Sequence, residues 1–229
     1  MKYDHFIITR FGVRSDQDGG LPSDEWVEDR LKKYEYICLS SLKGQLDQNF
    51  RVLLLVDSAF DARGYKIPLP SSRYEIVVVD EWWVHLAEII RERSAGTHVI
   101  TTRLDNDDAL GSEFVQRVQY EFKGQDAPTV IDLQRGVKYF QGKMGTFIYP
   151  SNMFISLINL VDRDEHCYSK QHPEMIRQFD TMSVRDSGPF WLHVVHPMSI
   201  TYKSPHQNVN DGLEWLGFFD VDLTKAGVL

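Results

Sequence analysis

Four apolar runs divide the first half of the chain, and three of them end at an aspartate. They are HFIITR (5–10), FRVLLLVD (50–57), YEIVVVD (74–80) and THVITTRLD (97–105). Short, continuous apolar runs of this kind are typical of strands that are buried on both faces of a parallel sheet. We therefore expect four such strands between residues 5 and 105.

Helical patterns lie between and after these runs. A helix that begins at Ser23 is predicted because its apolar residues recur at spacings of three and four along one face. These residues are Val27, Leu31, Tyr34, Cys38 and Leu42. Two more helices are predicted over 81–96 and 112–124, each closed by a glycine, with Ser112 as the N-cap of the second. Strands that alternate with helices predict an α/β sheet with helices packed on both faces.

The pattern changes at about residue 128, where the apolar segments become shorter and richer in aromatic residues. TVIDLQRGVKYF, GTFIYPS, MFISLINL and FWLHVVHPMSITYK predict mixed or antiparallel strands added to the same sheet, and a helix is expected around 171–182. No low-complexity linker separates the two parts, so we expect a single domain over 1–229 with halves at 1–127 and 128–229. The apolar C-terminal segment from Glu214 is expected to pack against it.

Composition narrows the classes of function. The 33 acidic and 25 basic residues give a formal charge of -8, which argues against a nucleic-acid binder because such proteins need Lys and Arg to neutralise phosphates. Cys38 and Cys167 lack the spacing of a zinc or redox motif, so we expect two buried thiols in a reduced, cytoplasmic protein. No run reaches the ~18 apolar residues of a membrane span, so no transmembrane segment is expected and only peripheral membrane contact stays open.

The segment TTRLDNDDAL (101–110) is the main candidate for chemistry. It places Asp105, Asp107 and Asp108 within four residues at the end of a predicted strand, where their mutual repulsion requires a cation or a helix N-terminus nearby. In α/β sheets ligands bind beyond the carboxyl ends of the strands, where Arg10 and Asp57 also fall. Ligands that are all oxygen suit Mg or Mn.

The same aspartates also fit an Asx turn, in which Asp107 or Asp108 would cap the helix predicted near Ser112. A calcium EF-hand loop that starts at Asp105 is excluded, because three required residue types are replaced by Ala109, Leu110 and Gln116. A sugar nucleotidyltransferase would need a glycine-rich segment after the first strand, and TRFGVR does not supply one. A cation site and a helix cap therefore both stay open.

The order of these motifs resembles a known fold and family. A first strand with an arginine, an aspartate after the second strand and Asp-x-Asp after a later strand resemble the glycosyltransferase-A fold. In that fold, Asp-x-Asp holds a divalent cation against the diphosphate of a nucleotide sugar. Five segments also resemble, in the same order, the motifs of a rhamnosyltransferase family of bacterial proteins: HFIITRFGVR, RLKKYEYICLSSLKGQ, FRVLLLVD, TTRLDNDDAL and FWLHVVH.

This resemblance covers roughly residues 5 to 200 and implies a metal-dependent glycosyltransferase with a glycosyltransferase-A-like fold. It implies that residues 1–127 bind a nucleotide-diphosphate sugar, with rhamnose as the candidate sugar, and that residues 128–229 bind a glycan or glycolipid acceptor. The cofactor that it implies is a divalent cation, Mn or Mg.

The resemblance also implies roles for single residues. Asp105 is expected to contact the ribose and to belong with Asp107 to the metal site, while Asp108 is either a second metal ligand or a support for the turn. His196 in WLHVVHP is the metal ligand expected from the second half of the chain. His193 is expected to be structural, because a strand would turn it to the opposite side from His196.

Charged residues at the other strand ends are candidates for donor binding. Arg10 and Arg14 flank the first loop, where a guanidinium can bind phosphate or stack on a base. Arg103 is expected either to bind the donor or to pair with the aspartates. The resemblance to the glycosyltransferase-A fold implies that Asp57 accepts hydrogen bonds from the base, and Asp80 is expected either to do the same or to cap the helix that follows it.

An inverting transferase also needs a carboxylate base that takes the proton of the acceptor hydroxyl. Glu174, Asp180 and Asp186 all lie in the second half, and Asp186 in RDSGPFW is preferred among them. Two alternatives of other classes stay open: a non-catalytic nucleotide- or carbohydrate-binding module, and a metal-dependent phosphohydrolase. Five aromatic residues could form sugar-stacking surfaces, but most of them are expected to be core residues and none is assigned to the site: Trp82, Trp83, Tyr139, Phe140 and Trp191.

Overall fold

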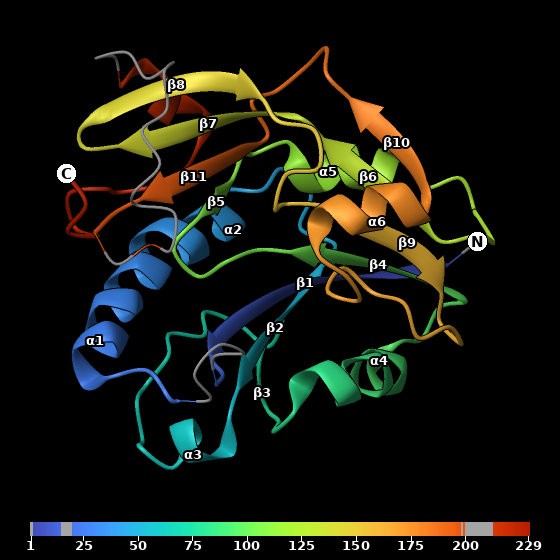
Figure 1. The fold of residues 1–229 in the computed structure, drawn as a ribbon, viewed down its shortest axis with the longest axis horizontal. Helices are drawn as coiled ribbons and strands as arrows, with labels where there is room; N and C mark the ends of the chain where they lie inside the picture. The colour runs from blue at the N-terminus through green and yellow to red at the C-terminus, as the bar shows by residue number, and fades with distance from the viewer. Residues whose placement is uncertain (1, 15–19, 198, 200–212) are drawn as a thin grey trace.

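The computed structural model describes residues 2–14, 20–197, 199 and 213–229. The larger of its two sheets has seven strands in the order β10-β6-β9-β4-β1-β2-β3 (Figure 1). Its strands are β1 (Tyr3–Gly12), β2 (Arg51–Val56), β3 (Tyr74–Val78), β4 (His98–Arg103), β6 (Thr129–Leu133), β9 (Ser156–Leu160) and β10 (Asp180–Val184). The four strands predicted in the first half of the chain are therefore confirmed.

Most strands of this sheet run in one direction. Strand β1 is parallel to β2 and β4, and β2 is parallel to β3. Strand β9 is antiparallel to both β4 and β6, and β6 is parallel to β10. All strands except β9 therefore point the same way, and their carboxyl ends share the edge at which α/β sheets bind ligands.

The predicted helix at Ser23 is confirmed. The Oγ of Ser23 accepts a hydrogen bond from the backbone N–H of Trp26 at 3.2 Å and caps α1 (Asp24–Lys33). A π-helical turn (Tyr34–Leu39) and α2 (Ser40–Lys43) continue α1 without a break. The other α-helices in the described residues are α3 (Ser58–Asp61), α4 (Trp82–Arg93), α5 (Phe114–Tyr120) and α6 (His172–Gln178).

Helices cover both faces of the sheet, as the sequence predicts. Along β2, Val52, Leu54 and Val56 belong to a buried cluster that includes residues of α1, α2 and α5. Leu53 and Leu55 belong to a second cluster with residues of α4. Because successive side chains of a strand point to opposite faces, one apolar run supplies both clusters. The predicted α/β architecture is thus present.

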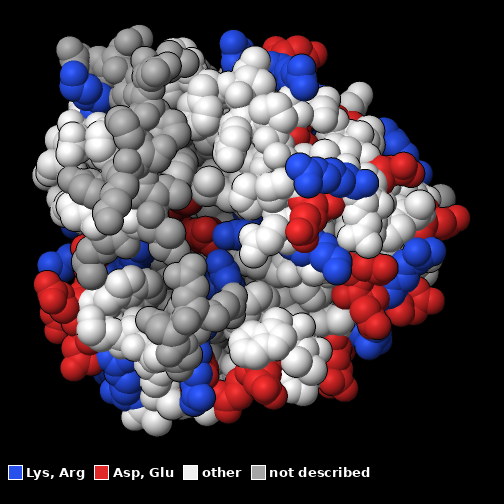
Figure 2. Space-filling model, in the orientation of Figure 1, with Lys and Arg blue, Asp and Glu red and all other residues white. Residues whose placement is uncertain are grey.

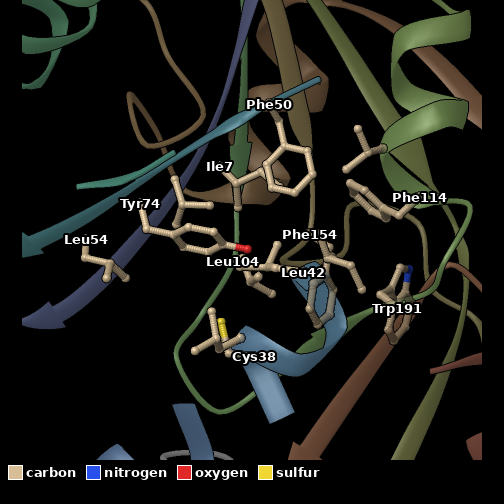
Figure 3. Packing of buried hydrophobic residues seen from close by; sticks show 14 of the residues in the cluster. Ile7, Cys38, Leu42, Phe50, Leu54, Tyr74, Leu104, Phe114, Phe154 and Trp191 are labelled. Atoms are coloured by element: carbon tan, nitrogen blue, oxygen red, sulfur yellow. The ribbon is translucent and has the colours of Figure 1, made fainter. Parts of the chain in front are cut away.

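Both cysteines are core residues, as expected. Cys38 lies in the first cluster, part of which Figure 3 shows, and Cys167 lies in the second. Both thiols are buried and free. No helix in the described part of the chain has both the length and the apolar character to span a bilayer.

The second half of the chain departs from the prediction. Only β6, β9 and β10 join the main sheet, whereas four other strands form a separate sheet in the order β5-β11-β7-β8. These are β5 (Ala109–Leu110), β7 (Arg135–Phe140), β8 (Lys143–Ile148) and β11 (Trp191–Val195). The prediction that all these strands extend one sheet is therefore wrong. The apolar sequence of a strand indicates that the strand is buried, but it does not indicate which of two sheets the strand joins.

The outer face of this second sheet is covered by the C-terminal segment. Leu192 and Val194 of β11 share a buried cluster with Phe219 and Leu223. The expectation that the apolar C-terminal residues pack against the domain is confirmed.

Three predicted helices have other boundaries in the structure. Helix α4 ends at Arg93, before the Gly96 expected to close it, and α5 ends at Tyr120, before Gly124. Helix α5 begins at Phe114 and not at Ser112, since the backbone N–H of Ser112 donates to Phe218 O at 3.3 Å and its side chain caps no helix. The helix expected around 171–182 ends at Gln178, because residues from Asp180 onward pair with β6 as strand β10. The predicted loop after the first strand includes residues 15–19, which lie outside the described residues.

Trp191 packs the two sheets together. Its ring stacks on Phe154, and the two ring centroids are 5.0 Å apart. Both residues are labelled in Figure 3. Nε1 of Trp191 donates to Leu133 O of β6 at 2.7 Å. Gly136 of β7 lies so close to this ring that an added Cβ would be 2.1 Å from Cδ2 of Trp191. The contact between the sheets therefore requires a glycine at this position.

We predict that Gly136→Ala destabilises the protein, because the added methyl group forces Trp191 out of its packed position. Overpacking of a core typically costs about 1–3 kcal/mol, which corresponds to a melting temperature roughly 2–12 °C lower for a chain of this size. Thermal unfolding followed by circular dichroism measures the change. Gly217→Ala is the control, since a Cβ there meets no atom within 4 Å. Equal melting temperatures for the two variants would contradict the proposed packing of Trp191.

Candidate functional site

The three aspartates lie in the turn between β4 and β5, which connects the two sheets. The backbone N–H of Leu104 still donates to Ile8 O at 3.2 Å, so the turn begins directly at the carboxyl end of β4. Within the turn, the N–H of Asp108 donates to Asp105 O at 3.3 Å. We call residues Asp105 to Asp108 the aspartate turn. Each of its carboxylates has a different environment.

Asp107 is held by two cationic or hydrogen-donating side chains. Its Oδ2 forms an ion pair with Nη1 of Arg30 and lies 2.9 Å from Nε2 of His196. Only 8% of Asp107 is exposed. Burial raises the pKa of Asp107, but Arg30 and His196 together outweigh this effect and lower the pKa to about 2. Asp107 is therefore a buried carboxylate that stays ionised.

Asp108 supports the turn. Its Oδ1 accepts a hydrogen bond from the backbone N–H of Val194 in β11 at 2.8 Å, and 2% of the residue is exposed. Burial and the neighbouring charges of Asp107 and Asp105 raise the pKa of Asp108 well above its ordinary value. Neither Asp107 nor Asp108 caps α5, whose N-cap is Glu113. The helix-cap role considered for these aspartates is therefore wrong.

Asp105 is the most exposed of the three. Its Oδ2 lies 3.2 Å from Nη2 of Arg103, and its Oδ1 lies 4.0 Å from Nη2 of Arg10. The Arg10 guanidinium lies 5.4 Å from the ring centroid of Trp82 and 5.0 Å from that of Tyr168. Guanidinium groups held by aromatic faces and one carboxylate keep donors for a further anion.

A cavity of about 500 Å³ opens beside Arg10 and Arg103. Its volume falls in the range of small-molecule sites. In the space-filling view, basic and acidic side chains meet in a recess near the centre of this face (Figure 2). The cavity is lined by Arg10, Trp82, Trp83, Arg103, Tyr168, Ser169, Lys170, Gln171 and Glu174.

A smaller cavity of about 160 Å³ lies at the carboxyl ends of β1, β2 and β3. It shares the two tryptophans with the larger cavity and is lined by Val13, Arg14, Asp57, Val79, Asp80, Glu81, Trp82 and Trp83. Nε of Arg14 lies 2.9 Å from Oδ2 of Asp57, whose Oδ1 caps α3 by accepting from Ala59 N. Of the predicted donor-binding residues, Arg10, Arg14, Asp57 and Arg103 therefore line one or other of the two cavities, and Asp105 forms an ion pair with Arg103.

Asp80 does not cap the helix that follows it. Its carboxylate accepts hydrogen bonds from the backbone N–H and the Oγ of Ser58, at the start of α3. Helix α4 begins after Glu81, which has φ of 49° and provides no side-chain cap. The expectation that Asp80 caps α4 is wrong, while its position in the smaller cavity agrees with the alternative expectation.

The three candidate bases lie in different places. Glu174 of α6 lines the larger cavity. Asp186 is exposed and follows the carboxyl end of β10. Asp180 begins β10 opposite Thr129, the first residue of β6, and so lies at the amino edge of the sheet, away from the aspartate turn. Of the three candidate bases, Glu174 is the one that lies at the larger cavity.

Sequence reasoning did not assign Arg30 to the site, nor six residues that line the larger cavity: Trp82, Trp83, Tyr168, Ser169, Lys170 and Gln171. Arg30 lies three residues after Val27 and four before Tyr34, on the buried stripe of α1. An arginine in that position is a signal for a buried carboxylate partner. The tryptophans directly follow the third strand, where its carboxyl end meets the ligand-binding edge.

The aspartate turn fits a divalent cation only in part. No group of three or more His, Cys, Asp or Glu side chains in the described part of the chain is placed to hold a metal. Arg30 and His196 both contact Oδ2 of Asp107, and Asp105 is partly exposed. Mg is commonly held by one or two carboxylates together with phosphates of the substrate and water. The two residues fit this mode of binding.

Together, the fold and the site define an α/β protein with arginine-lined cavities at the carboxyl edge of its sheet. The chain belongs to the family described as "Putative rhamnosyl transferase", whose model matches residues 18–204. It is therefore a transferase enzyme of the glycosyltransferase class, and its mixed, mostly parallel sheet with helices on both faces is the α/β architecture expected from the sequence. No curated protein sequence matches the chain significantly.

Solved structures show weaker similarity. Residues 1–349 of TarS from S. aureus match 83% of this chain at 10% identity with a TM-score of 0.44, and this chain covers 60% of that fragment. It covers 37% of a longer TarS structure, with 11% identity, a TM-score of 0.46 and 86% of this chain matched. HddC from Yersinia pseudotuberculosis matches 80% of this chain at 13% identity with a TM-score of 0.41, and 90% of HddC is covered.

We predict opposite effects for two neighbouring isosteric substitutions. Asp107→Asn leaves Arg30 buried without an ionised partner and should cost about 3–5 kcal/mol of unfolding free energy at pH 7. Asp108→Asn keeps an oxygen that accepts from Val194 and removes a group whose ionisation is unfavourable, so stability should be unchanged or higher. Urea denaturation of the two variants measures both effects. Equal losses at both positions would contradict the assigned environments.

The same variants should differ in their dependence on pH. The folded pKa of Asp107 lies below its ordinary value of 3.8, so its stabilising effect is present above that value and is lost as pH falls toward about 2. The folded pKa of Asp108 is raised, so wild-type stability should fall relative to Asp108→Asn as pH rises above 3.8. Denaturation series from pH 3 to pH 8 test both directions. A constant difference across this range would contradict the shifts.

Proposed function

We propose that the protein transfers a sugar from a nucleotide-diphosphate donor to a hydroxyl group of a glycan or glycolipid, with the help of a divalent cation. The observation that carries this proposal is the cavity at the carboxyl edge, where Arg10 and Arg103 flank Asp105. Rhamnose is the first candidate for the transferred sugar, on the strength of the family description alone.

The two cavities suggest where the parts of the donor bind. The smaller one offers carboxylate acceptors at Asp57 and Asp80 and a guanidinium at Arg14, which suit the nucleoside. The larger one offers Arg10 and Arg103 for the diphosphate and leaves room for the sugar and the acceptor. Since both cavities share Trp82 and Trp83, the donor would extend along these two side chains.

The departing diphosphate carries the charge that develops during transfer. A cation bound by Asp105 and Asp107 together with the donor phosphates would offset part of this charge as a Lewis acid. Arg10 and Arg103 would bind the same phosphates through charge-assisted hydrogen bonds. The stacking of Arg10 on Trp82 and Tyr168 keeps its guanidinium oriented before the donor arrives.

Glu174 is the proposed base of an inverting reaction. It is the only one of the three predicted carboxylates that lines the larger cavity. From there its carboxylate can take the proton of the acceptor hydroxyl as the new glycosidic bond forms.

A panel of nucleotide sugars with Mn tests the proposed donor. We expect one nucleotide class to raise the melting temperature of the wild-type protein, because a ligand that binds only the folded state stabilises it. The shift should be lost in Asp107→Asn and should be smaller with the nucleoside monophosphate. If no nucleotide diphosphate stabilises the protein in the presence of Mn or Mg, the proposal of a transferase with this donor is wrong.

Turnover of the donor identified in this way tests the base. Glu174→Gln should lower the rate of nucleoside diphosphate release by about 10²–10⁴-fold while the donor-induced thermal shift stays the same. Asp180→Asn is the control, since Asp180 lies at the opposite edge of the sheet. A loss in Asp186→Asn without a loss in Glu174→Gln would assign the role to Asp186 instead.

The products separate the two alternative functions. A phosphohydrolase would release nucleoside diphosphate or phosphate at the same rate with or without a glycan acceptor. A binding module would show the thermal shift and release nothing. Transfer of radiolabelled sugar to a glycan or lipid fraction is the result expected for a glycosyltransferase.

A further inference from the structure

Arg30 is a buried cation at the centre of the aspartate turn. Its Nη1 forms the ion pair with Oδ2 of Asp107 and also donates to Oδ1 of Asn106 at 3.1 Å. Its guanidinium lies 5.0 Å from the ring centroid of Trp26, and 7% of the residue is exposed. Arg30 is therefore fixed by its charge, by a hydrogen bond and by an aromatic face.

This arrangement neutralises Asp107 with the protein's own side chains. His196 lies against the same oxygen as Arg30, while Arg103 faces Asp105 and Val194 N–H satisfies Asp108. The charges of the turn are thus compensated within the fold itself. A free divalent cation that approaches Asp107 meets a carboxylate that is already paired and a guanidinium of like charge.

We propose that Arg30 is a positioning residue that acts as the resident counter-ion of Asp107 and makes cation binding depend on the diphosphate of the donor. This inference rests on the proposed function for the identity of the donor only. The diphosphate supplies the negative charge that the turn lacks once Arg30 has neutralised Asp107. The cation is therefore expected to bind together with the donor and to bind weakly to the protein alone.

The role of Arg30 predicts the behaviour of a variant without its charge. In Arg30→Met, Asp107 is a buried carboxylate that has lost its main counter-charge, which destabilises the fold. The same change removes a positive charge from the site of the cation and should strengthen the binding of Mn in the absence of nucleotide. Loss of stability and gain of cation affinity should occur in one variant.

Helix α1 also provides a matched control. Lys33 lies one helical turn after Arg30, is 2% exposed and forms an ion pair with Asp29. Lys33→Met therefore removes another buried cation from the same helix without touching the aspartate turn. A general effect of lost charge or lost stability would be the same in both variants.

Binding of Mn alone, measured by electron paramagnetic resonance and by thermal shift, tests the proposal. Wild type and Lys33→Met should bind Mn weakly and show little change in melting temperature. Arg30→Met should melt roughly 6–20 °C lower than wild type without metal, recover part of this loss with Mn, and bind Mn at least about tenfold more tightly than wild type. Arg30→Lys should resemble wild type in Mn affinity, because it keeps the charge.

If Arg30→Met does not fold, the double variant Arg30→Met/Asp107→Asn tests whether the unpaired charge of Asp107 is the cause. It removes both charges, so it should be more stable than Arg30→Met and should show no tightened Mn binding. Mn affinity that is unchanged in Arg30→Met, or tightened equally in Lys33→Met, would overturn the proposal. These measurements use no nucleotide. If no nucleotide sugar binds, the proposed function is therefore wrong, but the measured effect of Arg30 on Mn binding still stands.

Discussion

The structure depends on the compensation of buried negative charge in the turn between β4 and β5. Asp107 and Asp108 are buried at the junction of the two sheets, where an unpaired carboxylate would cost several kcal/mol. The protein resolves this in two ways. Asp107 is ionised and paired with Arg30 and His196, whereas Asp108 has a raised pKa and accepts a backbone hydrogen bond from β11.

These contacts draw together parts of the chain that are far apart in sequence. Arg30 comes from the first helix, the aspartates follow the fourth strand, and His196 follows the last strand of the second sheet. The second sheet is held against the first by the same region, since β5 pairs with β11 directly after the turn. The same residues therefore form the candidate site and hold the two sheets together, so a substitution at Asp107 affects both the site and the packing of the sheets.

Much of this could be predicted from sequence. The apolar runs that end at Asp57, Asp80 and Asp105 identify strands and also the edge where polar residues gather, because parallel strands end on the same side. His196 was predicted as a metal ligand together with the aspartates, and this role stays a prediction; the structure brings its Nε2 to 2.9 Å from Oδ2 of Asp107. What failed was the assignment of strands to sheets, since a local pattern indicates that β7 and β11 are buried and not which layer buries them.

The sequence also did not reveal which side chains contact one another. Arg30 looked like one of several charged residues on a helix, although its place on the apolar stripe of α1 was visible. Trp82 was assigned to the core, and it is indeed almost fully buried, yet it also lines both cavities. A residue that packs on one side and faces a ligand on the other gives the same sequence signal as an ordinary core residue.

The π-helical turn at Tyr34–Leu39 has a consequence for how the first helical segment meets the rest of the protein. Before it, Arg30 reaches the aspartate turn, and after it, the Oγ of Ser41 accepts from Leu110 N while Gln45 donates to Gly111 O. Deletion of one residue within the π-helical turn would rotate everything after it by about 100° relative to Arg30. The π-helical turn therefore sets the rotation of the chain after it relative to α1. With this rotation, Arg30 contacts the turn before strand β5, and Ser41 and Gln45 contact the end of β5.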